Sequence, residues 1–148
     1  KTILGMEAGF QAGIRQLRRK RPLETTTVRL PSGAELVIPT EQEILRIKAY
    51  LIVNRNQVRD YLDTAALADH LGMDEARQVL SDIDDYYAEM TNTETAVSTV
   101  LAERLYRCRP RDSKAIATLP RFKGLDARWA EWNNVKTACR ELAKGALG

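Results

Sequence analysis

The stretch "EQEILRIKAYLIVNRNQVRDYLDTAAL" (41–67) decides the fold, because it predicts two helices joined by a tight turn. Thr40 precedes it, and with Glu43 it forms the pattern of a capping box, in which each side chain accepts from the other residue's backbone N–H. Apolar side chains then recur at helical spacing until "NRN" (54–56) interrupts them. A second helix is expected over about residues 57–70.

The flanking segments predict a β-hairpin before these helices and further helices after them. Two β-branched runs, "TTTVRL" and "AELVIP", surround a Pro-Ser-Gly turn, which predicts a hairpin over about residues 25–39. Helices are expected over residues 73–90 and 93–107, followed by a loop and a last helix opened by Asp126. The predicted fold class is mainly α (α+β), a short β-hairpin followed by a helical bundle.

The N-terminal segment carries a weaker signal. Residues 1–21 predict an irregular helix ended by Pro22, in which Gly5, Gly9 and Gly13 weaken helical propensity. Because the first residue is not Met, we expect the chain to come from the middle of a longer protein.

Two apolar stripes are candidate core. The hairpin is expected to pack one face on the helices, because an isolated hairpin is only marginally stable. That face holds alternate residues Val28, Leu30, Leu36 and Ile38. The stripe of the last helix holds Trp132, Val135, Cys139 and Leu142, with Trp129 at its margin.

Composition excludes several classes of protein and leaves others open. The 148 residues carry 23 Lys or Arg and 20 Asp or Glu, with a net charge of +3, and contain no apolar run of about 18 residues. Cys108, Cys139 and the lone His70 lack the spacing of a disulfide framework, a zinc site or a Cys-His catalytic pair. Five cations in residues 15–21 and four in residues 104–111 can follow phosphates, or equally form solvated helix faces.

The central stretch contains four residues that are candidate site residues. Lys48 shares the apolar face of the first helix, where an ammonium either snorkels to the rim or meets a negative partner. Arg55 lies in the turn with no local partner. Asp60 suits the dipole of the second helix, and Arg59 can pair with Asp63 one turn later.

This set of residues resembles the third and fourth motifs of abortive-infection nucleotidyltransferases of the AbiEii/AbiGii type, which are toxins of bacterial toxin–antitoxin pairs. In that family a helix-borne lysine follows a short strand, and Arg-Asp-x-x-Asp opens the next helix after an arginine-containing turn. The resemblance covers about residues 34–70. It implies a C-terminal portion of such an enzyme.

The resemblance assigns roles to these residues. Such enzymes transfer a nucleotide from a nucleoside triphosphate (NTP) to an acceptor such as tRNA, which requires charge neutralisation and a positioned nucleophile. By resemblance, Lys48 contacts the triphosphate and Asp60 positions or deprotonates the acceptor, as the catalytic pair. Arg55 and Arg59 bind the nucleotide or its phosphates, or orient Asp60.

Two motifs of this family are missing from the chain. The Gly-Ser and Asp-x-Asp motifs of the family have no counterpart upstream of Asp60, so no metal site is expected in this chain. Mg²⁺ is expected only in a full-length enzyme, and this fragment is expected to be inactive alone. Residues 1–39 are then a remnant of the catalytic sheet domain, and residues 40–148 form the C-terminal helical bundle.

The expected partners are NTP, tRNA and a cognate antitoxin, with no membrane and a cytoplasmic location. The alternatives are a basic helical nucleic-acid-binding or antitoxin-like module without catalysis, and a structural interaction domain. The enzyme requires Lys48 and Asp60 to converge on one open cleft. The nucleic-acid-binding module requires the two basic clusters to merge into one convex stripe.

Overall fold

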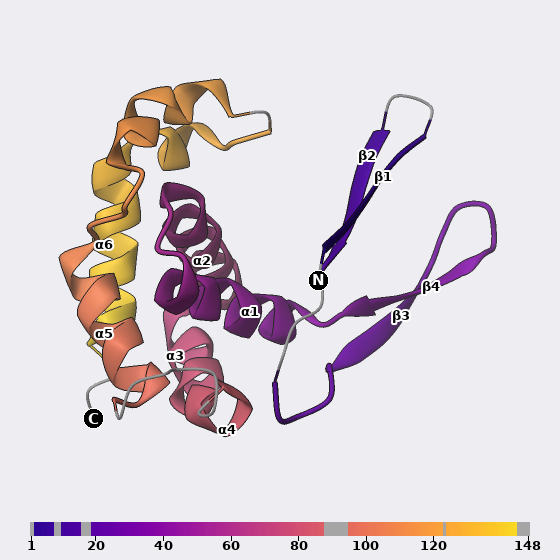
Figure 1. The fold of residues 1–148 in the computed structure, drawn as a ribbon, viewed down its shortest axis with the longest axis horizontal. Helices are drawn as coiled ribbons and strands as arrows, with labels where there is room; N and C mark the ends of the chain where they lie inside the picture. The colour runs from indigo at the N-terminus through magenta and orange to yellow at the C-terminus, as the bar shows by residue number, and fades with distance from the viewer. Residues whose placement is uncertain (1, 8–9, 16–18, 88–94, 123, 145–148) are drawn as a thin grey trace.

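The structure is a computed structural model, and it describes residues 2–7, 10–15, 19–87, 95–122 and 124–144 (Figure 1). Two β-hairpins precede a bundle of helices. The strands are β1 (Thr2–Glu7), β2 (Phe10–Arg15), β3 (Thr25–Arg29) and β4 (Glu35–Pro39). The helices are α1 (Glu41–Asn54), α2 (Val58–Leu71), α3 (Met73–Ser81), α4 (Ile83–Tyr87), α5 (Val97–Arg107), the 3-10 helices η2 (Ser113–Arg121) and η3 (Ala127–Ala130), and α6 (Trp132–Ala143). The predicted fold class is confirmed.

The start of α1 confirms half of the predicted capping box. Thr40 Oγ1 accepts from the Glu43 backbone N–H at 3.2 Å. The Thr40 backbone N–H instead donates to the Glu24 carbonyl at 3.0 Å. The Glu43 carboxylate is thereby free to turn inward, where it is fully buried against the Arg19 guanidinium. The predicted hydrogen bond from the Thr40 backbone N–H to the Glu43 carboxylate is therefore wrong, because Glu43 forms a tertiary ion pair with Arg19 instead.

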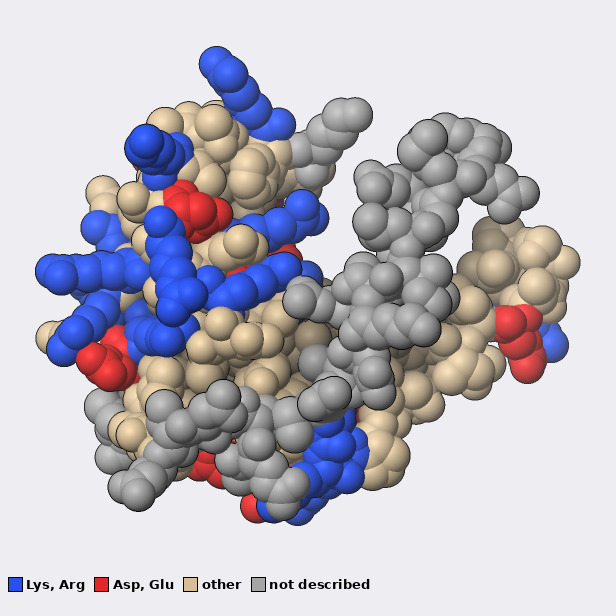
Figure 2. All heavy atoms as spheres, viewed as in Figure 1, with Lys and Arg blue, Asp and Glu red and all other residues tan. Residues whose placement is uncertain are grey.

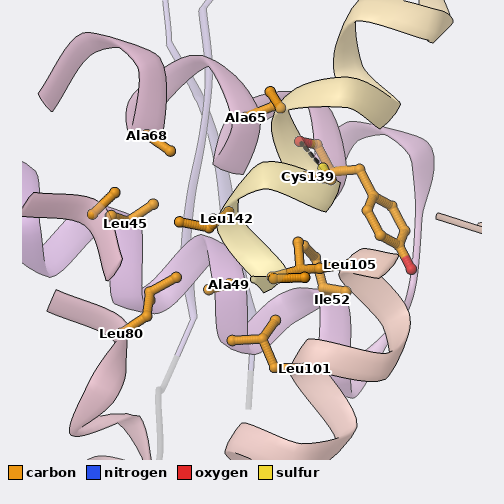
Figure 3. Packing of buried hydrophobic residues seen from close by; sticks show 14 of the residues in the cluster. Leu45, Ala49, Ile52, Ala65, Ala68, Leu80, Leu101, Leu105, Cys139 and Leu142 are labelled. Carbon is orange, nitrogen blue, oxygen red and sulfur yellow. Dashed lines mark hydrogen bonds between the residues drawn. The ribbon is translucent and has the colours of Figure 1, made fainter. Parts of the chain in front are cut away.

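The core lies between α1, α2, α5 and α6, where apolar faces of all four helices meet (Figure 3). Figure 3 shows Leu45, Ile52, Leu105 and Leu142 pointing into this space, and each is at most 1% exposed. Burying side chains of this size contributes about 1.5–3 kcal/mol each before entropy is counted. Among the described residues, the buried core cluster contains no residue of β3 or β4.

The last helix confirms most of the predicted stripe. Val135, Cys139 and Leu142 are buried, and the Cys139 thiol lies 3.9 Å from the Tyr61 carbonyl oxygen. The predicted burial of the two tryptophans is reversed, however. Trp129, expected at the margin, is buried, and Trp132, expected in the core, is half-buried. The reason is that Asp126 caps the separate turn η3, accepting from the Arg128 backbone N–H at 2.8 Å, so α6 begins six residues later than predicted.

The predicted third helix is broken rather than continuous. Its described part ends as α3 at Ser81, and α4 begins at Ile83. Asp82 between them has φ −102° and ψ 15°, outside the helical region, and its carboxylate lies 3.5 Å from the Arg46 guanidinium. Residues 88–90 of the prediction fall outside the described residues.

The β3–β4 hairpin forms where predicted but is packed differently. Val28 pairs with Leu36 in an antiparallel register, and Gly33 supplies the positive φ of 84° that the turn requires. Leu36 is 48% exposed and Leu30 is 41% exposed. Figure 1 shows the hairpin projecting away from the bundle. The prediction that its apolar face lies on the helices is wrong.

The N-terminal helix predicted within residues 1–21 is also wrong. Strand β1 pairs with β2 in an antiparallel hairpin, with Thr2 opposite Arg15 and Gly5 opposite Ala12. Each glycine disfavours a helix by about 1 kcal/mol relative to alanine, whereas a paired strand satisfies the same backbone groups. The division into residues 1–39 and 40–148 stays a prediction. Among the described residues, no helix combines the length and apolarity needed to cross a lipid bilayer.

Candidate functional site

Asp60 lies at the beginning of α2 and is fully buried. Its carboxylate accepts from the Arg55 guanidinium at 2.6 Å (Nη2) and 2.9 Å (Nε), and from the Gln57 backbone N–H at 3.1 Å. The hydrogen bond to Asp60 raises the pKa of Arg55. Asp60 therefore closes the α1–α2 turn, with its acceptor positions occupied by the protein itself.

Lys48 has a different partner. Its Nζ lies 2.7 Å from Asp63 Oδ2, an ion pair between α1 and α2 in which both side chains are less than one-third exposed. Arg59 approaches the same carboxylate only to 3.8 Å and is 72% exposed. The predicted i,i+4 pair is thus present but loose, because Lys48 from the neighbouring helix takes the shorter contact.

Three of the four predicted site residues therefore lie in two separate ion pairs beside one turn, and Arg59 makes only the looser contact with Asp63. Arg55 and Asp60 make up the first pair, and Lys48 with Asp63 makes up the second. Because Asp60 is fully buried, its carboxylate does not open onto a cleft. Sequence reasoning placed these residues in one neighbourhood but missed Lys48 and Asp63 as partners.

Two arginines of the first basic cluster are held by contacts near the start of α1. Arg19 pairs with the buried Glu43 and lies 4.8 Å from the centre of the Tyr86 ring. Arg21 lies 2.5 Å from Asp85 and 4.9 Å from the Tyr86 ring centre. Side chains of residues 15–18 are outside the described part. The two described arginines are thus held by carboxylates and an aromatic ring.

The second basic cluster lies at the opposite end of α1. Arg104 donates to the carbonyls of Ile52 and Val53 at 2.6 and 2.8 Å, which satisfies the C-terminal end of α1. Since α1 has 14 residues, the two clusters are separated by about 20 Å along its axis. The described residues therefore do not merge into one stripe, as the nucleic-acid-binding alternative required.

An open depression beside α3 is a further candidate. It is lined by Arg46, Asp74, Glu75, Gln78, Val79 and Asp82. Arg46 is engaged there, donating to the Val79 carbonyl at 3.2 Å and to Glu24 at 2.8 Å. Within the described ranges, no group of three or more His, Cys, Asp or Glu side chains is arranged to hold a metal ion. The Mg²⁺ of a longer enzyme stays a prediction.

Several transport proteins are similar to this chain in sequence. No family model matches the chain, and no solved structure matches it significantly. The heme uptake protein MmpL11 of Mycobacterium tuberculosis is 38% identical over 130 residues, covering 88% of this chain and 13% of that protein. The mycolic acid-containing lipids exporter MmpL11 of Mycolicibacterium smegmatis is 37% identical over 131 residues, with coverages of 88% and 13%. The probable transport protein MmpL11 of Mycobacterium leprae is 35% identical over 130 residues, with coverages of 88% and 12%.

These relatives overturn the functional expectations from the sequence. The resemblance to AbiEii/AbiGii-type nucleotidyltransferase toxins is wrong, since the relatives over 88% of the chain are transport proteins. The expected NTP, tRNA and antitoxin partners fail for the same reason, as do the nucleic-acid-binding alternative, the cytoplasmic location and the exclusion of a membrane. The pattern around Asp60 indicated the wrong class of protein, because an Arg-Asp pair that closes a helical turn also fits a catalytic motif. The chain spans about 13% of the length of these relatives.

Proposed function

We propose that this chain is a helical domain of a membrane transport protein of the MmpL11 kind. The observation that carries the proposal is 38% identity over 130 residues, 88% of the chain, to the M. tuberculosis protein named for heme uptake. The M. smegmatis relative is named for export of mycolic acid-containing lipids. Transport is the activity common to the names of these relatives.

The composition of the chain supports a place in water or among lipid headgroups. Lys, Arg, Asp and Glu make up 29% of the residues. A charged side chain at the centre of a bilayer costs at least about 2.5 kcal/mol. The bundle instead uses its charges in ion pairs on its surface, such as Arg128 with Asp69 at 2.8 Å and Arg77 with Glu141 at 2.8 Å.

An exchange of segments tests the proposal. The matched 131-residue segment of the M. smegmatis exporter is replaced by the matching part of this chain, and export of mycolic acid-containing lipids is measured in a strain lacking the native exporter. We expect export well above that of the exporter with the segment deleted. A matched control carries Leu105→Asp, which places a carboxylate at a fully buried core position.

Two outcomes contradict the proposal. In the first, the exchanged protein accumulates in the membrane fraction at the normal amount but exports no more than the deletion. In the second, the deletion itself exports at the native rate, so the segment has no part in transport.

A further inference from the structure

We propose that one face of the bundle binds the anionic surface of a lipid bilayer. This basic face consists of Arg107, Arg109, Arg111, Lys136 and Arg140. It comprises the end of α5, the segment after it, and one side of α6. The inference rests on the proposed function and deepens it, because it states which side of the domain meets the membrane.

Hydrogen bonds bring the parts of the basic face together. Arg140 Nε on α6 donates to the Tyr106 carbonyl on α5 at 3.2 Å. The Asn56 side chain in the α1–α2 turn donates to the Arg109 carbonyl at 3.1 Å, and the Arg111 backbone N–H donates to the Asn56 carbonyl at 2.8 Å. The backbone carrying these arginines is therefore fixed, while the charged ends of Arg109 and Arg111 are exposed.

The positive charge of the basic face is largely uncompensated. Residues 104–140 contain ten Lys or Arg and three Asp or Glu, a net +7 in a chain of net +3. Among the residues that the structure describes, Arg109, Arg111, Lys136 and Arg140 form no ion pair, and Arg107 pairs only with the exposed Glu103 at 3.1 Å. Figure 2 shows Lys and Arg side chains gathered over the end of α5 and the segment that follows it.

The acidic residue next to Arg111 in the sequence is exposed, but its carboxylate is held by a contact with α2. Asp112 Oδ1 accepts from the Val58 backbone N–H at 2.7 Å. An acid at the N-terminal end of a helix is stabilised by the dipole and by the free N–H groups there. Asp112 is thus bound at the beginning of α2 rather than paired with an arginine of the basic face.

The chemistry of the face fits lipid headgroups. A cluster of Lys and Arg beside a bilayer is attracted by anionic lipids, and each cation contributes about a fivefold gain in partition at physiological salt. Tyr106 lies among these cations with 64% of its surface exposed, and tyrosine is enriched at the headgroup level of membranes. The choice of a membrane over nucleic acid follows from the transport proteins that the chain resembles.

Co-sedimentation with vesicles tests the inference. The 148-residue chain is mixed with vesicles of phosphatidylcholine alone, or with one-quarter phosphatidylglycerol. We expect binding to the anionic vesicles only, weakening as salt is raised because exposed charges are screened. Arg109→Gln and Arg111→Gln should each weaken binding about fivefold, and the double variant about 25-fold.

Arg29→Gln is the matched control, since it removes the same charge from an exposed arginine on the projecting hairpin, 3.7 Å from Glu35. It should change binding less than twofold. Equal losses for Arg29→Gln and Arg109→Gln, or equal binding to both vesicle types, overturn the inference. Tighter binding to double-stranded DNA or RNA than to anionic vesicles in the same buffer also overturns it. Vesicle binding by the isolated chain is independent of the segment exchange, so a failure of either test is distinguishable from a failure of the other.

Discussion

At the scale of single residues, the α1–α2 turn depends on Asp60. Its buried carboxylate accepts from Arg55 and from the Gln57 backbone N–H. We predict that Asp60→Ala lowers the free energy of unfolding by about 3 kcal/mol, because a partly buried guanidinium and a helix N–H both lose their acceptor. Arg59→Ala, its exposed neighbour, should change it by less than about 0.5 kcal/mol. Urea unfolding of the two variants measures the difference, and equal stabilities would show that the turn does not need this carboxylate.

Tyr87 gives the fold a dependence on alkaline pH. Burial raises the pKa of Tyr87 from 10.0 to about 12, so the neutral phenol is favoured in the folded state. Its contribution is fully present below pH 10 and is lost as pH rises toward 12, because the unfolded chain releases this proton first. Over that window the free energy of unfolding should fall by about 1.4 kcal/mol per pH unit for this group.

We predict that Tyr87→Phe flattens this alkaline loss. Its buried hydroxyl has no hydrogen-bond partner of normal geometry among the described side chains and backbone groups, although the nearby Arg19 guanidinium opposes part of the rise in its pKa. Removal of the hydroxyl should therefore be neutral or stabilising by about 1 kcal/mol at neutral pH. Urea unfolding at neutral pH and at about pH 11.5 measures both effects. Other buried tyrosines, such as Tyr61, whose pKa burial also raises, leave a residual slope. An unchanged slope in Tyr87→Phe would contradict the assignment.

The sequence indicated which residues matter at this turn but not how they pair. Spacing within one helix predicts Arg59 with Asp63, and that contact exists at 3.8 Å. The shorter contact, Lys48 with Asp63 at 2.7 Å, joins two helices. Tertiary pairs of this kind depend on how α1 lies against α2, which single-helix periodicity does not contain.

At the scale of elements, the bundle and the β3–β4 hairpin should respond differently to the same substitution. Leu105 on α5 is fully buried, whereas Leu36 on β4 is 48% exposed. We predict that Leu105→Ala lowers the free energy of unfolding by about 2–5 kcal/mol through lost burial and a cavity. Leu36→Ala should lower it by less than about 0.5 kcal/mol. Chemical denaturation followed by circular dichroism compares them, and comparable losses would place the hairpin in the cooperative core.

Elements were predictable where local signals agreed with the tertiary structure. The Thr40 cap and the "NRN" interruption predicted the start of α1 and the turn between α1 and α2 close to where the structure has them. Prediction failed where competing contacts decided the outcome, as at Asp82, whose ion pair with Arg46 accompanies the break between α3 and α4. In the N-terminal segment, glycines weakened a helical pattern that the structure replaces with paired strands.

At the scale of the whole molecule, the basic face depends on packing between helices, which the sequence alone did not predict. The cluster in residues 104–111 was visible in the sequence, but Lys136 and Arg140 join it only because α6 packs beside α5. Their spacing of four residues placed both on one side of a helix. The local motif around Asp60 gave the wrong functional class, because its residues hold a turn together, and similarity along 88% of the chain corrected it.

The most direct measurement of the central claim is lipid export by the exchanged M. smegmatis protein as a function of the stability of the transplanted domain. Four variants of that domain are compared, Asp60→Ala, Leu105→Ala, Arg59→Ala and Leu36→Ala. If the folded bundle serves transport, export should persist with Arg59→Ala and Leu36→Ala. It should fall with Asp60→Ala and Leu105→Ala, in proportion to the folded fraction of the domain at the growth temperature. Export that is equal in all four variants while the domain is unfolded in two of them would contradict the claim that this chain is a working domain of a transport protein.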